Sequence, residues 1–185
     1  MALLLLGALT LAACSRHPVL RGGADITGVP WGQPFTLTDA AGHAFHSASL
    51  RGQVVLLYFG YLRCTDVCVP TLRRLAALRP RLEADGAPVT VVFVSLDPHD
   101  TSPRLARFIK PLGPGFVGLT GTPAAVARVA RDFQVAVARQ RGVPVKDRYL
   151  HSDGLYLLGP HGHPRLYAPA TISLSDLRHD IRALL

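Results

Sequence analysis

Two short runs of apolar residues constrain the fold of this chain more than any other feature. Residues 53–60 and 88–96 are almost free of charge, as expected of strands buried on both faces of a sheet. Between them, residues 66–84 carry leucines at three- and four-residue steps, which is typical of an amphipathic helix. We expect Pro80 to kink this helix or end it early. The order strand, helix, strand indicates an α/β fold.

The flanking segments extend this pattern to the whole C-terminal part of the chain. Further elements are expected, in chain order, as a hairpin of 35–39 and 43–46, a helix at 101–109, a short strand at 116–119, a helix at 122–133, a closing hairpin of 154–158 and 165–167, and a last helix ending at 185. The expected helix caps are Thr101 or Ser102, Thr122, and Ser173 or Ser175. This order fits a thioredoxin-like fold, with a mixed central sheet flanked by helices and an N-terminal β-hairpin.

The chain is strongly basic, with 20 Lys and Arg against 12 Asp and Glu and a formal net charge of +8. The arginines are scattered, and no basic run is longer than Arg73-Arg74. Nucleic-acid binding would require a basic stripe, ideally with interleaved aromatic residues, so we expect no nucleic-acid partner. An anionic membrane or an acidic protein suits such a surface better.

The N-terminus has the features of a bacterial lipoprotein signal. Residues 2–13 form an apolar stretch too short to span a bilayer, and the Leu-Ala-Ala before Cys14 resembles a lipobox, whose cysteine receives the lipid. The alternative is an ordinary cleaved signal with an incidental cysteine. We expect a signal peptide at 1–13, lipid attachment at Cys14, a tether at 14–32 and a folded domain at 33–185. Such an anchor places the domain at the periplasmic face of a bacterial membrane.

Cys64 and Cys68 follow directly after the first buried strand, at the strand edge where α/β folds bind their ligands. We expect Cys64 in the strand-to-helix turn and Cys68 in the first turns of the helix, on one helical face, so that the two sulfurs can approach each other. The helix dipole and Arg63 favour thiolate over thiol there. Such a pair binds a soft metal or closes into a redox disulfide, although two incidental core cysteines can have the same spacing.

A soft metal on two thiolates needs a third ligand, and histidine is the natural donor. Of the eight histidines, His151 stands just before a predicted strand, in a loop that can face the cysteine helix. Spacing alone does not favour it over His99. Two thiolates and one imidazole suit three-coordinate Cu(I), whereas structural zinc needs a fourth protein ligand.

Four motifs occur in a fixed order along most of the chain. They are FGYLRCTDVCVPTL at 59–72, FVSLDPHDT at 93–101, GLTG at 118–121 and YLHSDGLYLLGPHG at 149–162. Together they resemble the Sco/SenC family, thioredoxin-fold copper proteins that help to assemble cytochrome c oxidase. The resemblance covers roughly residues 25–185.

The resemblance implies a copper-binding metallochaperone that delivers one copper ion, Cu(I) or Cu(II), to the Cu(A) subunit of cytochrome c oxidase. It implies Cys64, Cys68 and His151 as metal ligands, the same two cysteines as a redox disulfide, and Asp97 beside the metal site. For Asp100 we expect a helix-capping role. A carrier of this kind needs an upstream periplasmic copper donor and a thioredoxin-like reductant that keeps its cysteines reduced.

Two other functions would use the same cysteines. A periplasmic thiol–disulfide oxidoreductase would act on a client's cysteines with Cys64 and Cys68 but without His151. A peroxidase is the third hypothesis, because peroxiredoxins share the fold, but a cysteine pair one helical turn apart disfavours it.

Overall fold

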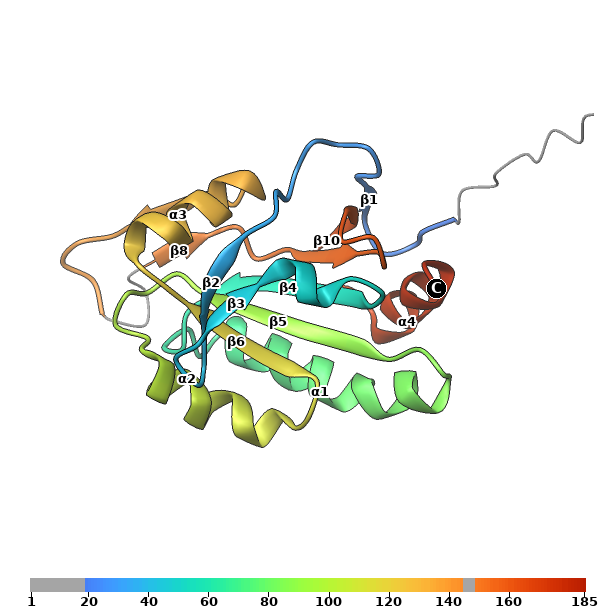
Figure 1. Ribbon diagram of the computed structural model, residues 1–185, viewed down its shortest axis with the longest axis horizontal. Coiled ribbons are helices and arrows are strands. Elements are labelled where there is room, and N and C mark those ends of the chain that lie inside the picture. The colour runs from blue at the N-terminus through green and yellow to red at the C-terminus, as the bar shows by residue number, and fades with distance from the viewer. Residues whose placement is uncertain (1–18, 145–148) are drawn as a thin grey trace, which may run out of the picture.

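The computed structural model describes residues 19–144 and 149–185 of the chain (Figure 1). One large mixed sheet has the strand order β1-β10-β9-β4-β5-β6-β2-β3, in which β4, β5 and β6 run parallel and the other pairs antiparallel. Its strands are β1 (Ala24–Asp25), β2 (Thr36–Asp39), β3 (Ala44–His46), β4 (Val54–Gly60), β5 (Val89–Ser95), β6 (Phe116–Thr120), β9 (Leu155–Leu158) and β10 (Pro164–Ala168).

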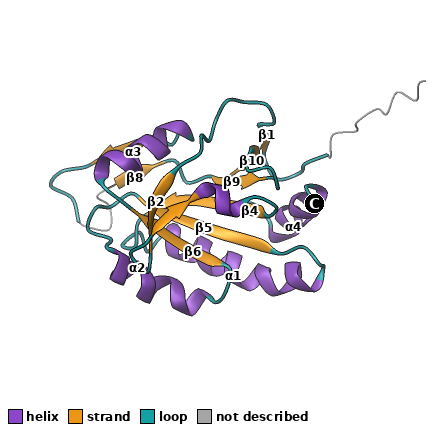
Figure 2. Cartoon of the chain, viewed as in Figure 1, coloured by secondary structure: helices purple, strands orange, loops and turns teal. Residues whose placement is uncertain are grey.

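Helices cover both faces of this sheet (Figure 2). They are α1 (Cys68–Ala84), α2 (Ser102–Ile109), α3 (Pro123–Asp132) and α4 (Leu174–Ala183), with short 3-10 turns at Ser47–Leu50 and Lys110–Leu112. Alternate residues of the central strands face opposite layers, as the two-residue period of a strand requires. Leu56 of β4 packs in the layer of α1, α2 and α4, whereas Leu57 packs in the layer of α3 and the N-terminal segment.

The thioredoxin-like architecture and the N-terminal hairpin of β2 and β3 are confirmed, and so are two of the expected caps. The Thr122 hydroxyl accepts a hydrogen bond from the Ala125 N–H, and the Ser173 hydroxyl accepts one from Asp176. The expected early end of the first helix is wrong, because α1 continues past Pro80 to Ala84. The proline ring lies on the exposed side of the helix, where it displaces no core residue, while Leu78 and Leu82 on either side of it stay buried.

Sequence reasoning missed a two-stranded antiparallel ribbon. It consists of β7 (Val137–Arg139) and β8 (Tyr149–His151), and it lies apart from the large sheet. In β7 all three side chains are exposed, so the strand carries no alternating pattern that would reveal it. Its register sets Val137 opposite His151, which makes this ribbon the support of the histidine.

Part of the segment expected to be a tether belongs to the fold. Ala24 and Asp25 pair with β10, and Ile26 is buried in the core. Upstream of them, the fully buried carboxylate of Asp180 on α4 accepts the backbone N–H groups of Arg21 and Gly22, each at 2.8 Å. The N-terminal segment is therefore fastened to α4.

The predicted signal peptide and lipid-attached Cys14 lie outside the described residues. Within the described ranges, no helix combines the length and the apolar character needed to cross a membrane.

Replacing Asp180 with alanine should release the N-terminal segment from α4. Two backbone donors would lose a charged acceptor, so the amides of Arg21 and Gly22 should exchange with solvent about tenfold faster or more. Hydrogen exchange followed by NMR measures this directly, with Arg182→Ala at an exposed position of α4 as the control. Unchanged exchange at both amides would show that Asp180 does not hold the segment.

Candidate metal centre

The site begins with a close approach between the end of β4 and the start of α1. β4 ends at Gly60, and a Cβ at this position would lie 2.8 Å from the Cys68 sulfur and 3.0 Å from the Phe93 ring. Only glycine leaves room for the sulfur there. Cys68 itself is fully buried as the first residue of α1.

Cys64 lies in the turn before the helix, as expected, but the two cysteines do not share a helical face. The helix starts only at Cys68, so a spacing of four within a helix is not what brings the sulfurs together. The turn folds back instead, with the Cys64 N–H donating to the Tyr61 carbonyl at 3.1 Å. This places the Cys64 sulfur over the helix N-terminus, where it accepts the Cys68 backbone N–H at 3.4 Å.

The ribbon of β7 and β8 brings His151 to the same point. Nε2 of the ring lies 3.6 Å from the Cys68 sulfur, while Nδ1 lies 2.8 Å from the Ser152 carbonyl oxygen. A carbonyl only accepts, so Nδ1 carries the proton, and in the neutral ring Nε2 presents its lone pair toward the sulfurs. The Tyr61 ring packs edge-on against the imidazole at 5.9 Å and steadies its orientation.

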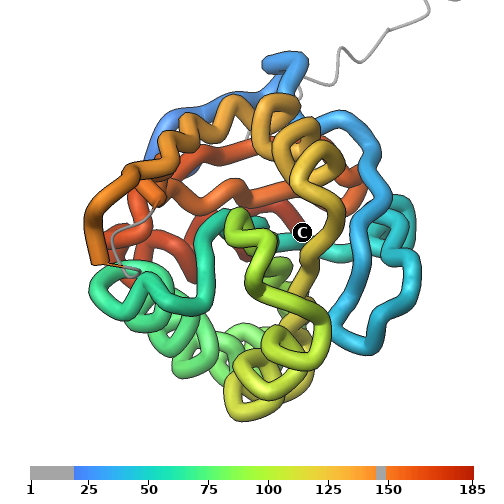
Figure 3. Tube along the Cα trace, turned by 90° about the vertical axis from the view of Figure 1, so that its left-hand side faces the viewer, coloured from blue at the N-terminus to red at the C-terminus, as the bar shows by residue number. Residues whose placement is uncertain are grey.

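Cys64, Cys68 and His151 thus converge, with one ligand atom from each lying within 4.8 Å of the other two. Within the described residues, this is the group of three or more histidine, cysteine or acidic side chains that could hold a metal ion. Cys68 is buried, whereas Cys64 and His151 are partly exposed, so the site opens on the side of these two residues. Figure 3 looks onto this end of the molecule.

The pKa values of the two thiols are shifted in opposite directions. The hydrogen bond with the Cys68 side chain, and then those with His151 and the backbone, outweigh burial and lower the pKa of Cys64 to about 4. The same bond with Cys64, together with burial, raises the pKa of Cys68. Burial lowers the pKa of His151, but hydrogen bonds to Cys64 and to the Ser152 carbonyl more than offset this, and the net shift is upward. Cys64 is therefore the thiolate of the pair.

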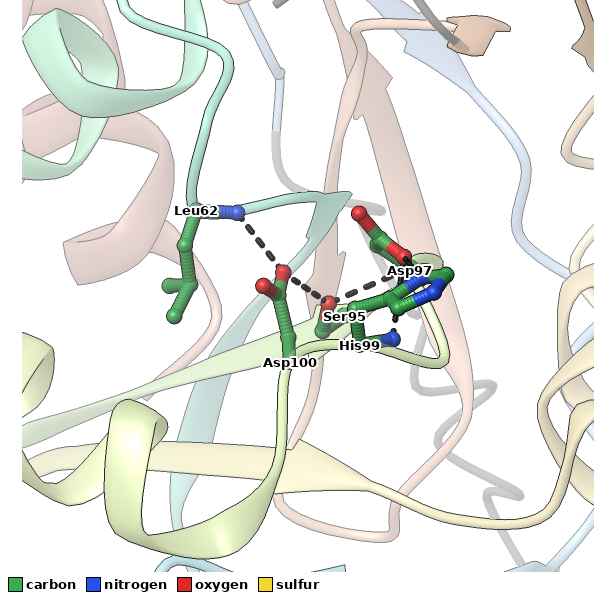
Figure 4. A network of polar contacts seen from close by, with 5 residues as sticks. All are labelled: Leu62, Ser95, Asp97, His99 and Asp100. Carbon is green, nitrogen blue, oxygen red and sulfur yellow. Dashed lines mark hydrogen bonds and ion pairs between the residues drawn. The ribbon is translucent and has the colours of Figure 1, made fainter. Parts of the chain in front are cut away.

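Asp100 holds the loop that carries Cys64, a role that sequence reasoning missed. Its fully buried carboxylate accepts the Leu62 N–H at 2.8 Å and the Ser95 hydroxyl at 2.7 Å (Figure 4). The expected capping role of Asp100 is wrong. The N-cap position of α2 is held by Thr101, and no side chain caps the helix there. The carboxylate instead joins the end of β5 to the turn after β4. The available sequence signal was an acidic residue shortly after an apolar strand.

Asp97 is also buried, at 1% exposure, and its nearest described partner is His99. One carboxylate oxygen accepts the His99 N–H at 3.0 Å and lies 2.8 Å from the imidazole Nδ1. Burial raises the pKa of Asp97, but these bonds and the positive charge of Arg63 outweigh it, so the pKa is lowered. Its expected place beside the metal stays a prediction.

The family model of SCO1/SenC matches residues 24–185, nearly all of the chain that the structure describes. The chain belongs to the SCO1/SenC family. The resemblance inferred from the four sequence motifs is thereby confirmed.

Relatives of this SCO1/SenC chain come from distant organisms. The mitochondrial SCO2 homologue of Bos taurus is 36% identical over 132 residues, which are 69% of this chain and 50% of that protein. An SCO2-like protein of Rickettsia conorii is 33% identical over 163 residues, 84% of this chain and 80% of that protein. The chain thus spans about half the length of the mitochondrial relatives that it matches.

Solved structures of Sco proteins share the fold. ScoI of Arabidopsis thaliana with copper bound superposes with a TM-score of 0.76 at 29% identity, over 82% of this chain and 96% of that one. ScoI of Bradyrhizobium japonicum with copper bound gives 0.73 at 30% identity, over 84% and 99%.

In the metal-free, reduced SCO1/SenC chain, the low pKa of Cys64 should make its alkylation almost independent of pH. The rate with iodoacetamide should stay level from neutral pH downward and fall only around pH 4, while buried Cys68 reacts slowly. Because the folded pKa lies below the ordinary value of 9.0, the contribution of the thiolate to stability is complete above pH 9, declines as the pH falls, and is gone below about pH 4.

The variant Cys68→Ala removes the largest cause of the shift, so the midpoint of the alkylation profile should move to higher pH. Mass spectrometry of the modified peptides gives both rates. A rate in the native chain that rises about tenfold per pH unit through neutrality, as for an ordinary thiol, would contradict the assignment.

Asp100→Ala should destabilise the chain by about 2–4 kcal/mol, because it leaves two donors without their charged acceptor in the interior. Ser95→Ala removes one of these donors and keeps the Leu62 bond, so it should cost less. Urea unfolding monitored by circular dichroism measures both. Equal urea midpoints for Asp100→Ala and the native chain would show that this carboxylate does not stabilise the loop.

Proposed function

We propose that this chain is a copper-binding metallochaperone that carries one copper ion on Cys64, Cys68 and His151. The observation that supports this most is the convergence of two sulfurs and one imidazole nitrogen within 4.8 Å. Two relatives with the same fold, ScoI of Arabidopsis thaliana and ScoI of Bradyrhizobium japonicum, were solved with copper bound. The proposal assigns the same cargo to this chain.

The ligand set favours copper over zinc. Thiolate sulfur and neutral imidazole are ligands that Cu(I) prefers, and Cu(I) accepts three of them. Structural zinc takes four protein ligands, whereas the group in the described residues has three. Binding would release the protons held on Cys68 and, in part, on His151, so affinity should rise with pH.

Delivery to the Cu(A) site of cytochrome c oxidase completes the proposal, on the strength of the family resemblance. Incoming thiolates would displace His151 first and the two sulfurs afterwards. The structure suits this order, because His151 lies on a separate two-stranded ribbon and is partly exposed, while Cys68 is buried. The partners are then the Cu(A) subunit, an upstream periplasmic copper donor and a thioredoxin-like reductant.

The second candidate is a thiol–disulfide oxidoreductase, favoured by the lowered pKa and partial exposure of Cys64. The Cys64 thiolate would attack a client disulfide and form a mixed disulfide, releasing one client thiolate. Cys68 would then lose its proton and attack Cys64, which frees the second client thiol and leaves a Cys64–Cys68 disulfide. A reductant with two thiols would restore the pair. This cycle makes no use of His151.

For location we propose the periplasmic face of a bacterial membrane, with a lipid on Cys14. The apolar residues 2–13 and the small residues before the cysteine support this. The described N-terminal residues lie beside α4, at the end of the molecule opposite to β8, the strand that carries His151 (Figure 1). An anchor there would leave the metal site facing outward.

Single substitutions at the ligands separate the two functions. Cys64→Ser and Cys68→Ser should each abolish stoichiometric Cu(I) binding, because either change removes a thiolate ligand. His151→Ala should weaken copper binding while leaving both cysteines able to form a disulfide. Metal content and absorption after copper loading of the reduced chain measure binding, and oxidase assembly in cells measures function.

Stoichiometric copper on either serine variant would refute the ligand assignment. Full oxidase assembly with His151→Ala would make thiol–disulfide exchange the main activity. The control is His43→Ala, an exposed histidine outside the cluster and away from Asp97.

A further inference from the structure

A hollow lies next to the metal centre, and none of the three candidate metal ligands lines it. It has a volume of about 480 Å³ and is bounded by the carboxyl ends of β5 and β6, helix α3 and the β7–β8 ribbon. Its walls are mostly apolar, with Leu96, Val126 and Val135 among them. Tyr149 lines the hollow and also packs against Tyr61, with ring centroids 5.4 Å apart, so the hollow and the metal centre share a wall.

One polar atom in this apolar wall lacks a partner. Asp97 lines the hollow at 1% exposure, and its Oδ1 accepts the two donors of His99. Its Oδ2 is buried and has no hydrogen-bond partner in the structure. Figure 4 shows this oxygen turned away from the other residues drawn. A buried carboxylate oxygen without a donor is costly, so the site is suited to a ligand that brings one.

The charges around the hollow favour a neutral donor over a cation. Asp97 already has His99 beside it, and Arg63 adds positive charge nearby. Two exposed arginines, Arg131 and Arg139, line the hollow at its mouth. A ligand ammonium would meet these like charges, whereas guanidinium groups stack well on the face of an aromatic ring. Apolar walls, one buried acceptor and arginines at the mouth together fit an aromatic group with a single N–H or O–H.

We propose that this hollow binds a tryptophan or tyrosine side chain of a partner protein, whose N–H or O–H donates to Oδ2 of Asp97. A protein is the expected source because the surface beside the hollow exposes two large apolar side chains. Val137, which lines the hollow, and Leu150 are two of the large apolar side chains that the described part of the chain exposes, at 42% and 59%. Both lie on the ribbon that carries His151. The inference does not depend on copper binding.

The test is an NMR titration of the metal-free, reduced chain with N-acetyl-tryptophanamide. Saturable shifts should be confined to residues of the hollow. The benzothiophene analogue of this probe has the same shape but no N–H, and it should bind about tenfold more weakly, because a hydrogen bond to a charged acceptor is lost. In Asp97→Asn the amide keeps an oxygen for His99 but can present a donor to the hollow, so the preference between the two probes should vanish.

A second pair of variants tests the location of the probe without altering Asp97. Ala127→Leu, at an exposed position of α3 that lines the hollow, should block the probe, whereas Ala124→Leu on the same helix does not line it and should bind normally. Absence of binding, or equal binding of the two probes to the native chain, would overturn the proposal. Binding of free indole without binding of N-acetyl-tryptophanamide would also overturn it, in favour of a small molecule.

Discussion

The contact between Gly60 and Cys68 is the constraint on which the rest of the site depends. Because β4 is buried along its whole length, its last residue has a fixed position in the sheet, and the missing side chain of Gly60 lets the first residue of α1 pack directly on it. This contact sets where the helix begins. It thereby fixes the position of the Cys68 N–H, which donates to the Cys64 sulfur, and of the Cys68 sulfur, which the His151 ring approaches.

Much of the fold could be predicted from local patterns. Continuous apolar runs gave the central strands, leucine spacing gave α1, and Thr122 and Ser173 marked two helix starts, because each of these signals is carried by residues close in sequence. The motif order also pointed to Cys64, Cys68 and His151. The features that could not be predicted depend on contacts between distant parts of the chain or on side-chain orientation. The β7–β8 ribbon has an exposed strand without periodicity, and the partners of Asp100 lie on a different loop and strand.

The failed helical argument for the cysteines is instructive in the same way. A spacing of four residues is compatible with a helix, but the sulfurs meet because a turn closes onto a helix N-terminus. The difference matters chemically. The Cys64 sulfur lies over the helix N-terminus and accepts the Cys68 backbone N–H, whereas the Cys68 side chain is fully buried at the first position of the helix. The hydrogen bond between the two side chains lowers the pKa of Cys64 and, together with the burial of Cys68, raises that of Cys68, and an unequal pair suits metal capture and disulfide exchange alike.

The grip of Asp180 on the backbone of Arg21 and Gly22 has a mechanical consequence. A force on the backbone of Arg21 reaches α4 through this buried carboxylate, and α4 lies at the opposite end of the molecule from β8, the strand that carries His151 (Figure 1). Such a force would not act directly on the turn that holds the two sulfurs.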